Sequence, residues 1–129
     1  MSAGPWLRRA GLTDRSALAV RCGFDDFDRI VVRPAPRWMA RLWHGPVAAM
    51  TVASTIYLRP GLEGTDPDVL ARLLVHELVH VRQWRELGRI RFVARYVGDY
   101  LRHRLRGLSH PDAYASIRYE VEARRIAGG

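Results

Sequence analysis

The sequence predicts an α+β fold in which a small sheet from the N-terminal half packs on a helical C-terminal half. Short runs of β-branched residues lie in the first half, and apolar residues recur at helical spacing through most of the second. A length of 129 residues suits one compact domain rather than two. We therefore expect a flexible arm over residues 1–12 and a single domain over residues 13–129.

Turn-forming residues divide the N-terminal half into short elements. The glycines and the proline within residues 1–12 favour a loose arm. Thr13 or Asp14 can cap a short helix that runs to about Cys22, because Gly23 follows as a stop signal. The other elements expected here are a strand over residues 28–33, one or two helical turns over 36–43, and one or two strands over 47–58.

The C-terminal half begins with the best-defined helix of the chain. Thr65 or Asp66 can cap this helix, Pro67 suits its first turn, and Gly88 suits the position after its end. A second helix over residues 89–106 carries an apolar stripe that we expect to face the core. Its members are Ile90, Val93, Val97, Tyr100, Leu101 and Leu105. The last expected elements are a segment opened by His110 and a closing helix over residues 117–127.

The charge balance is basic, with a formal net charge of +8 and 21 basic residues. All of these residues are Arg and none is Lys, which indicates a coding bias more than a binding device. The charge alone is therefore weak evidence for a nucleic-acid or membrane partner.

Cysteine usage and hydropathy favour a cytoplasmic protein. Cys22 is the single cysteine, so it can form neither an intrachain disulfide nor a cysteine metal cluster. No apolar segment typical of a signal peptide follows Arg8 and Arg9. The longest weakly polar run, over residues 46–58, is too short for a transmembrane segment.

The sequence HELVH at residues 76–80 is the motif that carries chemistry. His76 and His80 are four residues apart, so both imidazoles project from one helical face and can reach a single Zn²⁺. Glu77 then lies beside the metal, where it can accept a proton from a metal-activated water. In a chain of this length and composition, HExxH is expected by chance only about 0.007 times. The spacing therefore indicates a zinc site.

A zinc site of this kind needs a third protein ligand. Glu120 and Glu122 are two residues apart on a predicted helix, so only one of them can face the metal. The helical face of Glu120 is the more apolar, which favours it modestly. The full set of candidates for the third ligand is His44, His103, His110, Glu120 and Glu122.

HELVH followed by a helical glutamate resembles the gluzincin metallopeptidases, which have an HExxH…E site. The stretch YEVEARRIA, residues 119–127, is similar to the ExxAD-type helix of the membrane-associated gluzincins, and this resemblance implies Glu120 as the third zinc ligand. Where those families often have an Asp four residues later, this chain has Arg124. Glu122 and Arg124 are therefore candidates for an outer partner of the site, and Glu122 for an alternative ligand.

A longer resemblance covers roughly residues 24–127. AMTVASTIYLRPG…LLVHELVHVRQW, over residues 49–84, resembles the metallopeptidase-like domains related to extracellular contractile injection systems. FDDFDRIVVRP, over residues 24–34, is similar to the upstream strand of those domains, and the chain also looks like the compact minigluzincins. The resemblance implies a zincin-like domain built around an active-site helix.

The predicted function is that of a zinc metalloendopeptidase in which Glu77 is the general base. The strand near residues 52–58 can bind an extended peptide or protein substrate by strand addition. A side chain that stabilises the oxyanion is also expected, and the sequence does not choose among the candidates. These candidates are Tyr114, Tyr119, His103 and His110.

Two other functions stay open at this point. One is a catalytically inactive zinc-binding domain that acts as a protein- or nucleic-acid-interaction module. The other is a protein that binds nucleic acid, such as a DNA-associated protease with an SprT-like domain. The arginines concerned are Arg82, Arg85, Arg89, Arg91, Arg95, Arg102, Arg104 and Arg106. The same arginines could instead bind another acidic partner. A membrane-surface role for the same helix is the weaker idea, because the core is expected to need its apolar stripe.

Overall fold

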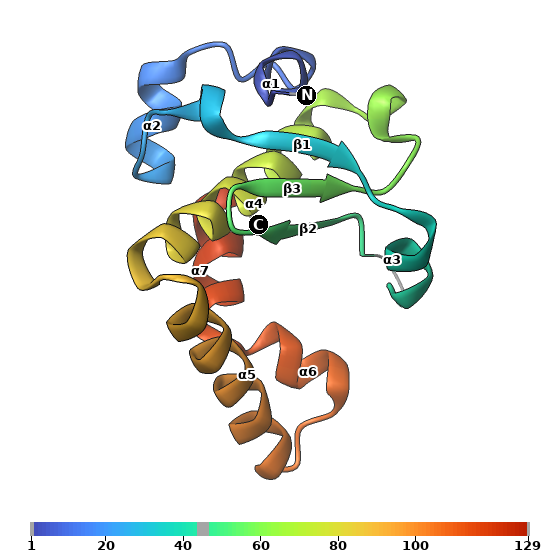
Figure 1. Ribbon diagram of the computed structural model, residues 1–129, viewed down its shortest axis with the longest axis vertical. Coiled ribbons are helices and arrows are strands. Elements are labelled where there is room, and N and C mark those ends of the chain that lie inside the picture. Colours follow the sequence, from blue (N-terminus) through green and yellow to red (C-terminus); the bar gives the residue numbers. More distant parts are fainter. Residues whose placement is uncertain (1, 44–46, 129) are drawn as a thin grey trace.

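The computed structural model describes residues 2–43 and 47–128 and has the predicted α+β architecture. Three strands form one sheet in the order β1-β3-β2. β1 (Val31–Pro34) is parallel to β3 (Thr55–Leu58), and β2 (Ala49–Val52) is antiparallel to β3 and lies at the edge. Figure 1 shows the sheet lying across the long helix α4 (Pro67–Leu87).

α4 begins and ends where its capping residues predict. The Asp66 carboxylate accepts a hydrogen bond from the Asp68 backbone N–H at 2.8 Å. Gly88 follows the last turn with a φ of 79°, a conformation that suits glycine. Apolar side chains on several faces of α4 are fully buried, so this helix is the centre of the fold.

The first residues differ from the loose arm that their composition suggests. They form α1 (Gly4–Arg9), and the Ala3 backbone N–H donates to the Ile30 carbonyl. Pro5 lies in the first turn of α1, where its missing N–H removes no helical hydrogen bond. Leu7 is only 2% exposed, so burial in the core explains why this segment is folded.

α2 (Arg15–Cys22) has the predicted bounds, with Asp14 as its cap and Gly23 as its stop. The helical turns expected over residues 36–43 are α3 (Arg37–Leu42). The region expected to form one or two strands is a hairpin of β2 and β3. Two short 3-10 turns lie at Phe27–Arg29 and Leu62–Gly64.

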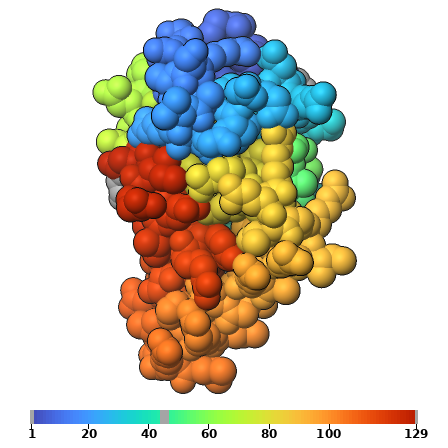
Figure 2. Space-filling model, turned by 90° about the vertical axis from the view of Figure 1, so that its left-hand side faces the viewer, coloured from blue at the N-terminus to red at the C-terminus, as the bar shows by residue number. Residues whose placement is uncertain are grey.

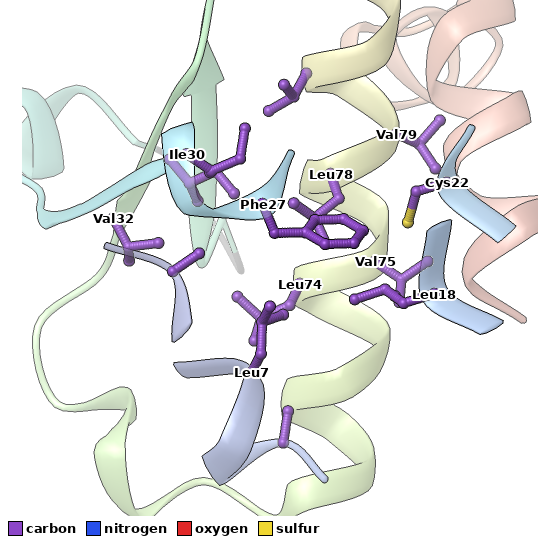
Figure 3. Close-up of a cluster of buried hydrophobic side chains, with 14 of the residues drawn as sticks. Leu7, Leu18, Cys22, Phe27, Ile30, Val32, Leu74, Val75, Leu78 and Val79 are labelled. Carbon is purple, nitrogen blue, oxygen red and sulfur yellow. The ribbon is translucent and has the colours of Figure 1, made fainter. Parts of the chain in front are cut away.

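The main hydrophobic core lies between α4 and the N-terminal elements (Figure 3). Side chains from α1, α2, β1 and β3 meet one side of α4 there. The labelled residues are Leu7, Leu18, Cys22, Phe27, Ile30, Val32, Leu74, Val75, Leu78 and Val79. This packing fixes the orientation of α4, and therefore the direction in which its polar residues point.

Three helices follow α4: α5 (Arg89–Leu105), α6 (His110–Ala115) and α7 (Arg118–Ala127). α7 packs along α4, and Figure 2 shows the two helices side by side on one face of the molecule. α5 and α6 form the lower end of the molecule in Figure 1. Within the described parts of the chain, no helix is long and apolar enough to cross a membrane.

The apolar stripe of α5 is not in the core, so this expectation from the sequence is wrong. Ile90 and Leu105, at its two ends, are 88% and 89% exposed, and the stripe residues between them are about half exposed except Tyr100, which is more buried. The buried residues of α5 are instead Phe92 and Asp99, on a different face. That face is turned toward the rest of the protein because Phe92 packs on Trp84 of α4 and Asp99 binds the start of α7.

Candidate metal centre

Two helices bring three metal-ligating side chains together. The four-residue spacing on α4 places His76 and His80 on one face, and the packing of α7 on α4 places Glu120 opposite them. The Glu120 carboxylate has one oxygen 3.0 Å from the His76 Nε2 and the other 3.0 Å from the His80 Nε2. One ligand atom from each residue lies within 4.8 Å of the other two, and this is the single such group among the described residues.

Charge is concentrated at this buried position. Burial raises the pKa of Glu120, but hydrogen bonds from His76 and His80 outweigh burial and leave this pKa far below its usual value. For His80 the effect of burial has the opposite sign, because burial lowers the pKa of a histidine. The hydrogen bond to Glu120 and the charge of Glu120 outweigh burial and raise the pKa of His80 to about 9. In the metal-free protein the His80 Nε2–H therefore donates to the carboxylate, and that proton must leave before a metal can bind there.

Gln83 fixes the ring of His80 from the other side. The His80 Nδ1–H donates to the Gln83 Oε1 at 2.8 Å, which leaves Nε2 as the nitrogen that faces the cluster. The Gln83 Nε2 in turn donates to the Tyr119 carbonyl and to Glu122, so its own side chain is held by α7. Gln83 is almost fully buried.

The three residues fit a zinc ion. Two imidazole nitrogens and one carboxylate oxygen are a donor set that zinc accepts in sites with one open position. Each imidazole directs its Nε2 at the same carboxylate, and a buried carboxylate between two imidazoles is the arrangement expected around a shared cation. The predicted ligands His76, His80 and Glu120 could therefore hold a metal ion together.

Glu77 lies beside the cluster but points to the sheet. The Thr51 hydroxyl on β2 donates to the Glu77 Oε2 at 2.6 Å, and it also lies 3.3 Å from the Glu77 carbonyl oxygen. Glu77 is buried, and burial raises its pKa against the opposing charge of His80 and the Thr51 hydrogen bond. A carboxylate with a raised pKa is a stronger base than an exposed one, which suits a group that accepts a proton.

Two tyrosines line the α5–α6 side of the centre. The Tyr96 hydroxyl donates to the Glu120 Oε2 at 2.8 Å. Tyr114 lies edge-on to Tyr96 and is 43% exposed. Burial of its hydroxyl, followed by the charge of Glu120, raises the pKa of Tyr114 to about 12, so the hydroxyl keeps its proton at neutral pH.

The other predicted oxyanion stabilisers lie elsewhere. His103 faces Asp99 at 3.9 Å, and the His110 Nδ1 is 2.7 Å from the Tyr100 hydroxyl. The ring of Tyr119 packs on Phe92. Of the four candidates, Tyr114 is the one whose hydroxyl feels the charges of Glu120 and Glu77.

The alternative ligands are also placed away from the cluster. Glu122 accepts hydrogen bonds from Arg82 and Gln83, so it reaches the centre only through Gln83. Arg124 donates to the Ala115 carbonyl and does not pair with Glu120. His44 lies outside the described residues.

The sequence alone predicts no role at the metal site for Thr51 or Tyr96, and it includes Gln83 only within the stretch that carries a resemblance. The position of Gln83, three residues after His80, is a signal that the sequence does carry, because residues i and i+3 are neighbours on a helix. Thr51 and Tyr96 contact the centre from other elements, and no spacing in the sequence indicates those contacts.

Residues 12–88 match the family of eCIS core domains. The chain belongs to the eCIS core domain family. The matched part of this eCIS core domain runs from before α2 to the end of α4, so it contains His76, Glu77, His80 and Thr51. Glu120, on α7, lies beyond it. The searches of curated proteins and of solved structures return no match.

The eCIS core match confirms the resemblance to contractile-injection-system domains. It begins earlier and ends earlier than the range of about 24–127 over which that resemblance was expected. α5 to α7 therefore lie outside the family match, although α7 supplies the third residue of the cluster.

Proposed function

We propose that this eCIS core domain is a zinc-dependent metallopeptidase of the gluzincin type. The observation that carries the proposal is the convergence of His76, His80 and Glu120 next to the buried carboxylate of Glu77. A site that only stabilised the fold would need the three ligands but not Glu77 in this place.

In this proposal His76, His80 and Glu120 hold the metal, and Gln83 keeps the His80 Nε2 directed at it. Bound zinc would supply a Lewis acid that polarises the scissile carbonyl and lowers the pKa of water. Thr51 occupies the Glu77 Oε2, so the Oε1 is the atom free to accept the proton of the attacking water. Glu77 then passes this proton to the leaving amine, as a general base that becomes a general acid.

The edge of the sheet supports a peptide as the substrate. β2 is an edge strand, and its Thr51 contacts Glu77 directly. An extended peptide that pairs with β2 would therefore pass beside the general base. Tyr114 is the proposed donor to the oxyanion, since it is a partly exposed residue whose hydroxyl keeps its proton beside the charge of Glu120.

Metal analysis combined with a peptidase assay tests the proposal. Purified protein should bind about one zinc per chain, and His76→Ala should bind far less. Glu77→Gln should keep the zinc and lose hydrolysis of a quenched fluorescent peptide library at neutral pH, whereas His110→Gln is a matched control that should keep both. Full zinc retention in the His76→Ala/His80→Ala double variant would overturn the site. Zinc binding without hydrolysis in the unmodified protein would favour the inactive zinc-binding domain.

A further inference from the structure

α5 presents a continuous apolar face to solvent. Five residues at spacings of three, four, four and four lie on this face, and we call them the α5 stripe. They are Ile90, Val93, Val97, Leu101 and Leu105. From the first to the last they extend about 22 Å along the helix. Figure 1 shows α5 running away from the sheet toward the lower end of the molecule, so the fold leaves the stripe uncovered.

The apolar surface continues beyond the helix at its first turn. An open groove between the β2–β3 hairpin and α5 is lined by Val52, Trp84, Ile90 and Val93 among others. Val52 is itself substantially exposed. The α5 stripe therefore joins an apolar hairpin tip, and the two form one extended face.

Arginines flank the α5 stripe on both sides. By helical position, Arg91 lies on one flank of the stripe, Arg89 lies on the other, and Arg104 lies beside its last turn on the same side as Arg89; all three are exposed. Within residues 2–43 and 47–128 none of the three makes an ion pair, and the one side-chain hydrogen bond among them runs from Arg104 to the Leu108 carbonyl. The only acid of α5, Asp99, is buried and bound to Arg102 and Arg118. The charge beside the stripe is therefore positive and not neutralised by the protein.

We propose that the α5 stripe and its flanking arginines dock this protein on the surface of an anionic phospholipid bilayer. An exposed amphipathic helix of this kind lies in the plane of the interface, with its apolar residues among the acyl chains and its arginines at the lipid phosphates. Arg side chains are long enough to reach the head groups while their apolar stems follow the stripe. The metal centre plays no part in this docking.

The charge distribution disfavours the other occupants of this face. A second copy that packed stripe against stripe would bring two sets of unpaired arginines together. Nucleic acid would satisfy the arginines but leave the five apolar residues in water. An anionic bilayer satisfies both the apolar and the charged parts of the face.

Vesicle sedimentation tests the proposal with the full chain. The protein should bind vesicles of phosphatidylcholine with about one third phosphatidylglycerol, bind pure phosphatidylcholine weakly, and release as salt is raised. Val97→Gln/Leu101→Gln should weaken binding about fivefold or more, since both side chains are exposed and their replacement leaves the core intact. Val20→Gln, at an exposed valine on α2 away from the stripe, is the control and should bind normally.

A second pair of variants separates the effect of the flanking arginines on vesicle binding from the effect of net charge. Arg89→Gln/Arg91→Gln should weaken binding about tenfold or more, while Arg72→Gln/Arg125→Gln changes the net charge equally and should have little effect. Equal losses in the two double variants would overturn the proposal, as would failure of the unmodified protein to bind anionic vesicles. Sedimentation equilibrium that shows a dimer abolished by Val97→Gln/Leu101→Gln, without vesicle binding, would assign the face to a second copy. Salt-sensitive binding to duplex DNA without vesicle binding would assign the arginines to nucleic acid.

Discussion

Gln83 decides which nitrogen of His80 faces the candidate metal centre. Its Oε1 accepts the Nδ1–H of His80, and its Nε2 donates to α7. The amide thus binds the ligand on α4 and the backbone next to Glu120 on α7 at the same time. A single side chain therefore sets the tautomer of one ligand and the position of another.

Replacing Gln83 should weaken metal binding without removing it. Gln83→Met keeps the length of the side chain but offers His80 no strong acceptor, and we expect zinc affinity to fall about 10- to 100-fold. Competition with a chromophoric chelator measures this change. His103→Gln, which alters a histidine outside the centre, should bind zinc normally. Unchanged affinity in Gln83→Met would show that packing alone orients the His80 ring.

Thr51 should act on Glu77 in the proposed peptidase. Thr51→Val is nearly isosteric and removes the hydroxyl that donates to the Glu77 Oε2. We expect kcat to fall about 10- to 100-fold with little change in KM, because a misplaced general base slows proton transfer more than binding. Thr51→Ser should recover most of the rate, and zinc content should be normal in both variants.

Thr55→Val, on the neighbouring strand, is the matched control for Thr51→Val and should leave kcat unchanged. If Thr51→Val has the same kcat as the unmodified protein, the hydroxyl is only a structural partner of Glu77.

At the scale of single elements, local signals predicted helices better than turns. α4 carries a capping Asp66 and a terminating Gly88, which act within one turn and can be read directly from the sequence. The β2–β3 turn contains no Asn-Gly or Asp-Gly signal, and Ala53 has a positive φ of 55° there. α1 forms because Leu7 is buried by elements distant in sequence, which no local pattern can indicate.

Asp99 joins α5 to α7. Its carboxylate accepts the Arg118 backbone N–H at 2.7 Å, at the first turn of α7, and pairs with the side chains of Arg102 and Arg118. Burial raises the pKa of Asp99, but the hydrogen bonds and charge of Arg118 outweigh burial and leave the pKa below its ordinary value of 3.8. Ionised Asp99 therefore stabilises the junction that positions Glu120.

Removing the Asp99 carboxylate should destabilise the fold. Asp99→Ala leaves the first turn of α7 without its acceptor, and we expect a loss of about 2–3 kcal/mol in the free energy of unfolding. Because the folded pKa is lowered, this contribution is complete well above pH 3.8 and is lost as the pH falls through the folded value. Urea unfolding at pH 7 and pH 3 should therefore show a smaller difference between the variant and the unmodified protein at pH 3.

The exposed Asp112 provides the control for Asp99→Ala. Asp112→Ala should change stability at pH 7 by much less. A difference between Asp99→Ala and the unmodified protein that is the same at both pH values would contradict an ionic role for Asp99.

At the scale of the whole molecule, the sequence located the three candidate metal ligands but not which surfaces are covered. Glu120 could be favoured over Glu122 because the helical face of Glu120 is apolar, and that face is the one that packs on α4. The same argument failed for α5. Its apolar stripe looks like a core face by periodicity, yet Phe92 and Asp99 turn the opposite side inward. Periodicity shows that a face exists, and only the packing of all the helices shows whether anything lies against it.

The candidate metal centre takes residues from both α4 and α7, so metal binding there should stabilise the whole fold. The cluster takes its ligands from two helices, with Glu120 40 residues after His80, and the unfolded chain cannot present them together. Zinc at about 100 times its dissociation constant should raise stability by about 2.7 kcal/mol, or roughly 10 °C in Tm, and EDTA should reverse the shift. Glu120→Gln should lose most of this increment, because α7 then contributes no carboxylate to the cluster. Glu63→Gln, at an exposed site, should keep the increment. An equal zinc-dependent shift in Glu120→Gln, measured by differential scanning calorimetry, would show that the ion does not join the two helices.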